Sequence, residues 1–254
     1  MLETFMRDPQ SNTLAVLVLI ALIITILVLL RTMLRDEGVD IREDWYAWLL
    51  PAFTLLGIPA ALNLIQTTGV AFIFAVIVFI VFLLNIIVPI LGISGKFSHP
   101  LVNYWYRWAI LASIIGGLAV TIYITFIEAT NAPIMCGPSS QCPTVQNSRY
   151  AILFGVLPVG VLGLLGYIGI LISWIGWQFG PQSIRNFMVL SLWGMCIFGV
   201  LFSTYLTFLE PFVIGATCMW CISSAVLMIG LLLTSNPVAY QAFTPPLEEE
   251  FSIE

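Results

Sequence analysis

The sequence predicts an all-α integral membrane protein. Hydrophobic residues make up 60% of its 254 positions and charged residues only 8%, whereas about a quarter of the residues in a soluble domain are charged. Several apolar runs exceed the ~18 residues that a membrane-crossing helix requires. The eight Lys and Arg residues are scattered along the chain and form no basic face. Nothing in the sequence therefore indicates nucleic-acid binding.

The apolar runs predict seven spans. The first, at about 13–30, is too long for a signal peptide and lacks a small-residue cleavage site, so we interpret it as a permanent anchor. The second, at about 45–65, is interrupted by Pro51, Pro59 and Asn63. The other five are expected at about 70–91, 108–127, 151–174, 187–208 and 212–233.

The basic residues predict the orientation, because Lys and Arg concentrate on the cytoplasmic side. With the polar loop at 129–150 outside, six basic residues lie inside: Arg31, Arg35, Arg42, Lys96, Arg107 and Arg185. Only Arg7 and Arg149 then lie outside. The prediction is therefore a plasma-membrane protein with its N-terminus outside and its C-terminus in the cytoplasm.

A polar, turn-rich stretch near 94–106 divides the chain. Residues 1–100 are predicted to form an N-terminal membrane region of about three spans and contain no cysteine. Residues 101–234 hold four spans and all five cysteines. Residues 235–254, which include three consecutive glutamates at 248–250, are expected to form a disordered acidic tail.

Cys136 and Cys142 lie in the one long polar loop, on either side of Gly-Pro-Ser-Ser. A turn of this composition can bring the two sulfurs together. Cysteines that face the oxidising outer side of a bacterial plasma membrane are expected to pair or to cycle. A static disulfide that clips the loop is the alternative to a redox-active pair.

The second cysteine pair, Cys218 and Cys221, lies at the outer end of the last span with two residues between them. On a helix this spacing puts both sulfurs on one face and predicts a redox-active dithiol. If Thr217 caps the helix, both sulfurs lie in its first turn, where the helix dipole favours the thiolate. Buried apolar cysteines are one alternative. A four-thiolate zinc site is another, although a pair on a lipid-embedded helix is awkward for it.

Other polar and small residues in this half have simpler expected roles. Cys196 lies alone in the middle of a span, as a packed small residue does. Glu128 and Glu210 lie at span ends, where either can relay protons, although solvation at the interface is the expected role. A row of glycines in the fifth span indicates close helix packing rather than catalysis. These are Gly160, Gly163, Gly166 and Gly169.

The segment of about 105–234 resembles the bacterial branch of the vitamin K epoxide reductase family. The matching order is a span, a loop with Cys136 and Cys142, Ser148 six residues later, two spans, and then a CxxC that opens the last span. The stretch at 117–123 also looks like the family's first core helix. The resemblance implies a four-helix transmembrane bundle, which about three extra transmembrane helices precede in this chain.

The same resemblance implies a quinone-dependent thiol oxidoreductase that generates disulfide bonds. Electrons from a thioredoxin-like partner would enter at Cys136 and Cys142, and Cys142 would exchange with Cys218. Cys221 would face a membrane quinone of the ubiquinone or menaquinone type, against apolar residues of the fifth and seventh spans. Ser148 corresponds to a family serine or threonine near the thiols. Few residues follow the last span, so the partner is expected to be a separate protein on the outer face.

The sequence departs from the family pattern at one position, and two other classes of protein stay open. Ala225 stands where animal relatives carry a quinone-contacting tyrosine, so the resemblance does not extend to epoxide reduction and assigns no hydrogen bond to the quinone. A DsbB-type oxidase carries its CxxC in the first exposed loop, which is the reverse of the order here. The alternative from another class is a non-enzymatic transporter or assembly subunit with structural disulfides.

Overall fold

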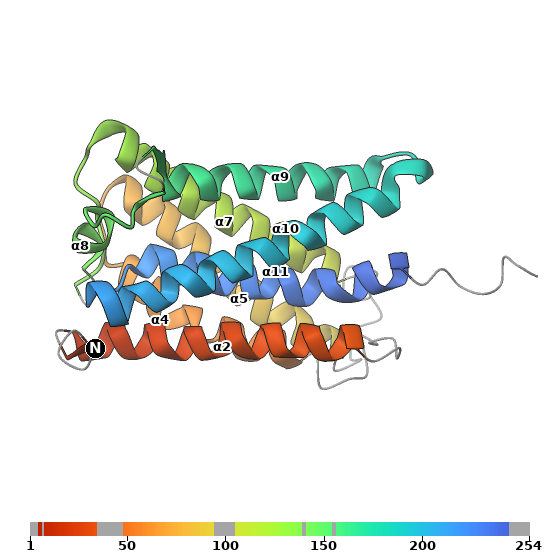
Figure 1. Cartoon of the computed structure of the whole chain (residues 1–254), viewed down its shortest axis with the longest axis horizontal. Helices are drawn as coiled ribbons and strands as arrows, with labels where there is room; N and C mark the ends of the chain where they lie inside the picture. Colours follow the sequence, from red (N-terminus) through yellow and green to blue (C-terminus); the bar gives the residue numbers. More distant parts are fainter. Residues whose placement is uncertain are drawn as a thin grey trace, which may run out of the picture.

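The computed structural model describes residues 5–6, 8–34, 48–93, 105–138, 141–153 and 156–243. Within these residues the protein is a bundle of long helices that run side by side along the long axis of the molecule (Figure 1). The long helices are α2 (Pro9–Leu34), α5 (Val70–Ile93), α7 (Trp105–Thr130), α9 (Val159–Phe179), α10 (Gln182–Leu209) and α11 (Met219–Phe243). All six are long and apolar enough to cross a membrane, which confirms the predicted all-α membrane fold.

The second of the seven predicted spans is not one continuous helix. Instead of one long helix the chain forms two short ones, α3 (Leu49–Thr54) and α4 (Gly57–Leu64). Pro51 and Pro59 each lie in the first turn of one of them, where a missing N–H costs nothing, whereas inside a continuous helix it would break the hydrogen-bond ladder. Leu50 packs against the start of α7, and α4 ends at the loop beyond α7, so the broken pair still returns the chain from one end of the bundle to the other.

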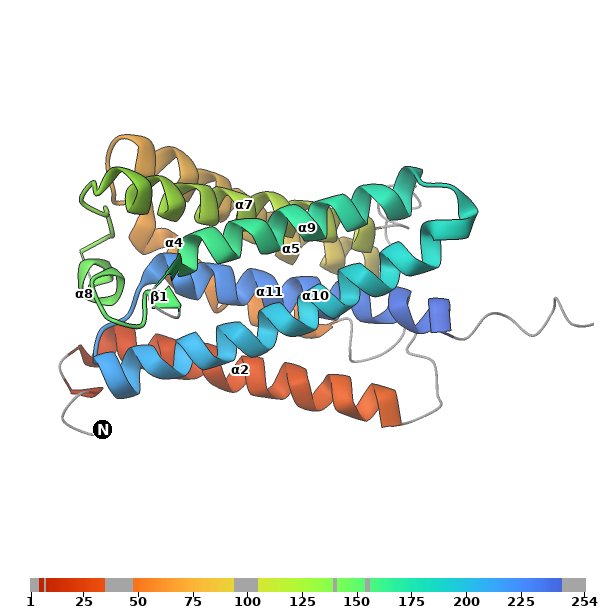
Figure 2. The same cartoon turned by 45° about the horizontal axis from the view of Figure 1, so that its top comes forward.

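The elements that carry the outer cysteines gather at one end of the bundle. The beginning of α2, the short helix α8 (Cys142–Gln146) and the beginning of α11 lie at the same end in both views (Figures 1 and 2). A two-stranded ribbon, β1 (Ile152–Leu153) and β2 (Leu157–Pro158), leads from this end into α9. The other end of the bundle holds the junction between α9 and α10.

Helix α11 is the central helix. In its apolar segment 83% of the residues are buried, against 22% in α9 and in α10. It packs against α7, α10 and α2, and also against the short helices α3 and α4. Side chains on the outer faces of α9 and α10, such as Ile172 and Leu201, are exposed and suit contact with lipid.

The predicted C-terminal tail begins too early. Helix α11 continues through Pro237 to Phe243, and Asn236 is buried. The acidic segment at 248–250 lies outside the described residues, as does the polar stretch at 94–104 on which the predicted domain boundary depends.

Candidate active site

The two loop cysteines form a disulfide. Cys136 and Cys142 are joined, with their Cα atoms 6.2 Å apart. Cys142 is the first residue of α8 and is fully buried, whereas Cys136 is half-buried. One sulfur of the pair therefore faces the protein interior and the other lies nearer the surface.

Cys218 and Cys221 are free thiols at the start of α11. The helix begins at Met219, and the carbonyl of Cys218 accepts the first helical bond, from the N–H of Ile222 at 3.0 Å. Cys218 therefore holds the N-cap position that the sequence analysis gave to Thr217. Its sulfur takes the place of the side-chain oxygen that usually accepts hydrogen bonds there.

This position favours the thiolate of Cys218. Burial by itself disfavours the charged form, but the Cys221 thiol and the backbone N–H groups of Cys221 and Trp220 all hydrogen-bond to the Cys218 sulfur. Together these hydrogen bonds outweigh burial and lower the pKa of Cys218 below its ordinary value. The lowered pKa increases the fraction of Cys218 that is present as the thiolate, the form that attacks a disulfide.

The disulfide loop is docked against this thiolate site by backbone hydrogen bonds. Gln141, just before Cys142, donates its N–H to the carbonyl of Thr217, just before Cys218, at 3.2 Å. Met135, just before Cys136, forms two hydrogen bonds between its backbone and aromatic side chains. Its N–H donates to the Tyr123 hydroxyl at 2.9 Å, and its carbonyl accepts from the Trp220 indole at 3.0 Å.

The Tyr123 and Trp220 rings also contact each other, with centroids 4.5 Å apart. Trp220 lies between the two cysteines of CxxC, so a single side chain joins that motif to the loop. The sequence analysis gave no role to either aromatic residue, because only the folded chain brings positions so far apart in sequence together.

Glu210 is buried beside the CxxC thiols, not solvated at the interface as predicted. Only 3% of it is exposed, and its Oε2 accepts the N–H of Cys218 at 3.2 Å. The carboxylate also hydrogen-bonds to the Cys221 thiol. It lies on a π-helical turn, η2 (Glu210–Ile214), which is a geometry often found at functional sites.

The η2 turn ends at Gly215, whose φ of +74° is the left-handed conformation that suits glycine. The N–H groups of Gly215 and Ala216 both donate to the Glu210 carbonyl, at 2.8 and 3.2 Å. This closure fixes the backbone of Glu210 in front of the thiols.

Glu128, the second carboxylate, has a structural role. It lies on α7 and accepts the N–H of Gly160, in the first turn of α9, at 3.3 Å. A carboxylate in this position satisfies a free N–H group and complements the helix dipole. The interface solvation predicted for Glu128 is therefore wrong as well.

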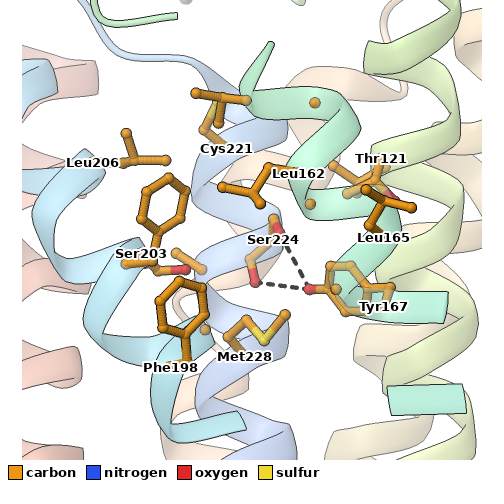
Figure 3. A pocket seen from close by; sticks show the side chains of 18 of the residues that line it. Thr121, Leu162, Leu165, Tyr167, Phe198, Ser203, Leu206, Cys221, Ser224 and Met228 are labelled. Atoms are coloured by element: carbon orange, nitrogen blue, oxygen red, sulfur yellow. Dashed lines mark hydrogen bonds between the residues drawn. The ribbon is translucent and has the colours of Figure 1, made fainter. Parts of the chain in front are cut away.

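A cavity of about 690 Å³ opens beneath the CxxC motif, between α7, α9, α10 and α11. Figure 3 shows Cys221 at one end of it, with Leu162 and Leu206 nearby and Phe198 and Met228 deeper inside. Apolar residues of α9 and α11 line it, as predicted, and α10 forms a wall that the sequence analysis did not anticipate.

Two hydroxyl groups meet in the wall of this cavity. The Tyr167 hydroxyl lies 3.2 Å from the Ser224 Oγ and donates to the Ser224 carbonyl at 3.3 Å (Figure 3). Ser224 follows Cys221 by three residues, so both lie on the same face of α11. The Tyr167 ring fits here because Gly117 on α7 leaves it space.

The predicted glycine row packs only in part. A Cβ at Gly163 would lie 2.9 Å from the Thr121 methyl, so this position does bring α9 and α7 together. A Cβ at Gly166 would meet nothing within 4 Å, and Gly160, Gly163 and Gly166 all line the cavity. The row therefore makes room for a ligand as well as for a neighbouring helix.

A smaller cavity adjoins the large one at Cys221. It is lined by Glu210 and Ser148 among others, and it shares Gln146, Val159, Leu206 and Cys221 with the large cavity. The Ser148 hydroxyl is buried and has no hydrogen-bond partner in the described part of the chain. A polar atom left unsatisfied beside a reactive sulfur is a candidate for a role in the reaction.

Cys196 is separate from this site. It is fully buried on α10 and hydrogen-bonds to Ser235, which agrees with its predicted role as a packed residue.

An all-helical membrane bundle with two cysteine pairs docked at one end, above an apolar cavity, is a membrane thiol oxidoreductase by class. Comparison with known families assigns it further. Residues 107–235, half of the chain, match the vitamin K epoxide reductase family, and the chain belongs to that family. No solved structure matches the chain. Family members use quinone-type electron carriers and generally work with a thioredoxin-like partner.

Proposed function

We propose that the protein is a quinone-dependent thiol oxidoreductase that generates disulfide bonds in proteins outside the plasma membrane. One observation carries the proposal: Cys221 lines an apolar cavity of about 690 Å³, while Thr217, directly before Cys218, is hydrogen-bonded to the loop that holds the disulfide. The CxxC motif thus stands between a water-facing disulfide and a ligand cavity inside the bundle. A structural disulfide alone would need neither the cavity nor the free dithiol.

The loop pair is the entry point in this proposal. A thioredoxin-like thiol on the outer face reduces the Cys136–Cys142 disulfide and leaves with its own cysteines oxidised. The half-buried position of Cys136 suits contact with this partner, and the buried position of Cys142 suits contact with CxxC. The Cys142 thiolate then attacks Cys218 of an oxidised CxxC, and the Cys218–Cys221 bond breaks.

The exchange ends when Cys136 attacks Cys142. This restores the loop disulfide, frees Cys218, and leaves CxxC with two more electrons. The described structure, with the loop pair bonded and CxxC reduced, corresponds to this stage. In this stage Cys218 and Cys221 are ready to reduce the electron acceptor.

The large cavity fits a quinone of the ubiquinone or menaquinone type. Its volume falls in the range of small-molecule sites, ~300–1,000 Å³, and such sites combine apolar walls with a few polar groups. Ser224 and Tyr167 supply hydroxyl groups that can bond to a quinone carbonyl, in place of the animal tyrosine that is Ala225 here. A bound quinone supplies a two-electron acceptor, and Cys221 is the sulfur that faces it.

Access to the cavity is also suited to a lipid-soluble molecule. Helices α9 and α10 meet at their junction and diverge toward the loop end (Figure 2). Leu165 and Phe198 line the cavity from these two helices, and each side chain is more than half exposed, so the cavity is not closed off there. A quinone can therefore enter from the lipid, whereas a charged nucleotide would have to lose its hydration.

In this proposal residues 101–234 form the oxidoreductase domain, residues 1–100 form an additional membrane region, and the outer cysteines face the exterior. The basic residues support this orientation, with the N-terminus outside and the C-terminus in the cytoplasm.

The experiment is anaerobic turnover of the purified protein with a reduced thioredoxin-like substrate and added quinone. We expect quinol to form in proportion to substrate oxidised, and Cys221→Ala to abolish it. Cys196→Ala, which removes a buried thiol outside the site, is the matched control and should turn over normally. Equal turnover without quinone, or activity that survives the loss of Cys221, would refute the proposal and favour structural disulfides.

A further inference from the structure

We infer that Glu210 is the catalytic base of CxxC oxidation, taking the Cys221 thiol proton as the disulfide closes. The inference deepens the proposed function, because it concerns the same CxxC motif. It rests on the place of the carboxylate: 3% exposed, bonded to the Cys218 N–H at 3.2 Å and hydrogen-bonded to the Cys221 thiol.

The reduced CxxC holds its last proton on Cys221. The hydrogen bonds at the N-cap favour the thiolate at Cys218, and the Cys221 thiol is one of the donors to it. For the Cys218–Cys221 bond to form, the S–H bond of Cys221 must break. Water has little access to this proton, because Cys218 is fully buried and Cys221 is only partly exposed, where it lines the two cavities.

Glu210 is the carboxylate that the described structure places against that proton. Its backbone is fixed by the η2 turn and its Oε2 by the Cys218 N–H, so the carboxylate is oriented before the reaction begins. The small cavity that it lines joins the large cavity at Cys221. A proton taken by Glu210 is therefore released beside the same sulfur from which the electrons depart.

The atoms and electrons balance as follows. One S–S bond forms between Cys218 and Cys221, and the S–H bond of Cys221 breaks. Two electrons pass to the bound quinone together with two protons. One of these protons comes from the Cys221 thiol and is carried by Glu210. The other comes from outside water, because Cys218 is already a thiolate and has no proton to give.

A fixed negative charge without a base function would have the opposite effect. A carboxylate near two thiols disfavours their ionisation, so neutralising it would make the thiolates easier to form and would speed oxidation. If Glu210 accepts the proton, its neutralisation slows oxidation instead. The sign of the change therefore separates the two roles.

The test needs neither quinone nor loop cysteines. In a background with Cys136, Cys142 and Cys196 replaced by serine, the reduced CxxC is oxidised by diamide, a small neutral thiol oxidant, and disulfide formation is followed by alkylation and mass spectrometry. We expect Glu210→Gln, which keeps an acceptor for the Cys218 N–H, to close the disulfide ~100-fold more slowly. Glu210→Asp should recover part of the rate.

Glu128→Gln is the matched control, since it neutralises a half-buried carboxylate at the same end of the bundle; its rate should equal that of the background protein. A Glu210→Gln rate equal to or above the background rate overturns the inference. If the glutamine variant does not fold, Glu210→Asp decides alone, and an unchanged rate overturns it. The diamide experiment uses no quinone, so a failed quinone assay would not affect the conclusion about Glu210. Likewise, an unchanged diamide rate in Glu210→Gln would not refute the proposed quinone acceptor.

Discussion

The hydroxyl of Thr217 donates a hydrogen bond to the Asn12 side chain at 2.9 Å, across 205 positions of the sequence. Asn12 is fully buried on α2, and its amide N–H also donates to the Phe5 carbonyl at 2.9 Å. Helix α2 therefore holds the residue that directly precedes Cys218. This helix lies outside residues 107–235, which match the family.

A second polar contact ties the other end of α2 to α11. The Asn236 amide donates to the Thr32 hydroxyl at 3.1 Å and accepts the indole N–H of Trp193 at 3.2 Å. Hydrogen bonds between helices in an apolar bundle fix their register, because the polar groups have few other partners there. Helix α2 thus packs as part of the oxidoreductase bundle. Of the two contacts, the one between Asn12 and Thr217 adjoins the reactive cysteines, and the one between Asn236 and Thr32 does not.

These two contacts predict different effects for matched substitutions. Asn12→Ala and Asn236→Ala should each lower the free energy of unfolding by about 1–3 kcal/mol, because each removes a buried amide that forms two hydrogen bonds. Only Asn12→Ala should also slow exchange between the loop and CxxC, since only Asn12 holds Thr217. Thermal unfolding and quenched thiol mapping measure the two effects. Equal exchange rates in the two variants would contradict the positioning role of Asn12.

The second prediction concerns the order of thiol exchange. In Cys221→Ser the Cys218 thiolate cannot form the CxxC disulfide and should attack Cys142, releasing the Cys136 thiol. We expect the Cys142–Cys218 mixed disulfide to accumulate, because the hydrogen bond from Gln141 to Thr217 holds the two sites together. Peptide mass mapping after acid quenching identifies the bridge. Finding only the Cys136–Cys142 disulfide would argue against the exchange.

The site residues that the sequence could predict are those whose chemistry is encoded locally. The CxxC spacing, the two loop cysteines and Ser148 are visible in a single chain, and the long apolar runs predict the membrane helices. The second span is broken into two short helices, which hydropathy alone does not predict, because Pro51 and Pro59 each lie in the first turn of a separate helix.

The residues that the sequence analysis missed or misread act through tertiary contacts. Glu210 was assigned to the interface because it ends an apolar run, yet the η2 turn folds it back onto the thiols. Asn12, Tyr123 and Trp220 reach the site only when helices from both halves of the chain pack together. No local pattern marks such contacts.

The third prediction tests the large cavity. A side chain at Gly166 would project into open space within it, so Gly166→Phe should occupy part of the cavity while leaving the fold intact. We expect the KM for quinone to rise at least tenfold, with thiol exchange between the cysteine pairs unchanged. Ile172→Phe, on the exposed face of the same helix, is the control. Unaltered quinone kinetics in Gly166→Phe would place the quinone elsewhere.

The fourth prediction concerns pH. The lowered pKa of Cys218 means that its thiolate persists at pH values below the ordinary thiol range of about 8.5. Alkylation of Cys218 in a protein without loop cysteines should therefore stay fast as the pH falls below that range. Because the folded-state pKa is depressed, the stability it contributes is present above the ordinary pKa and is lost as the pH falls through the lowered one.

The Cys221 thiol is a donor to the Cys218 sulfur, so its removal should change this profile. In Cys221→Ala burial is less well opposed, and the alkylation midpoint of Cys218 should move to higher pH. Cys221→Ser keeps a donor at the position and should shift it less. Identical midpoints in the two variants would mean that the hydrogen bond from Cys221 does not control the Cys218 thiolate.

The last prediction separates function from stability at Ser148. Its hydroxyl is buried without a hydrogen-bond partner among the described residues, beside Cys221 and Glu210 in the small cavity. An unsatisfied buried hydroxyl costs free energy, so Ser148→Ala should leave the melting temperature unchanged or slightly raised. Turnover should nevertheless fall by ~100-fold, because the hydroxyl can donate to the Cys221 thiolate that forms when Cys142 attacks Cys218.

No mixed disulfide should accumulate in Ser148→Ala, since the hydroxyl assists the departing sulfur and takes no part in a covalent step. Ser148→Thr keeps the donor and should retain most of the activity, while Asn147→Ala, at the exposed neighbouring position, should behave as the unmodified protein. A lower melting temperature with normal turnover would show that Ser148 supports the loop rather than the reaction. Retained stability with reduced turnover would mean that the protein keeps an unsatisfied hydroxyl there because the leaving thiolate needs it.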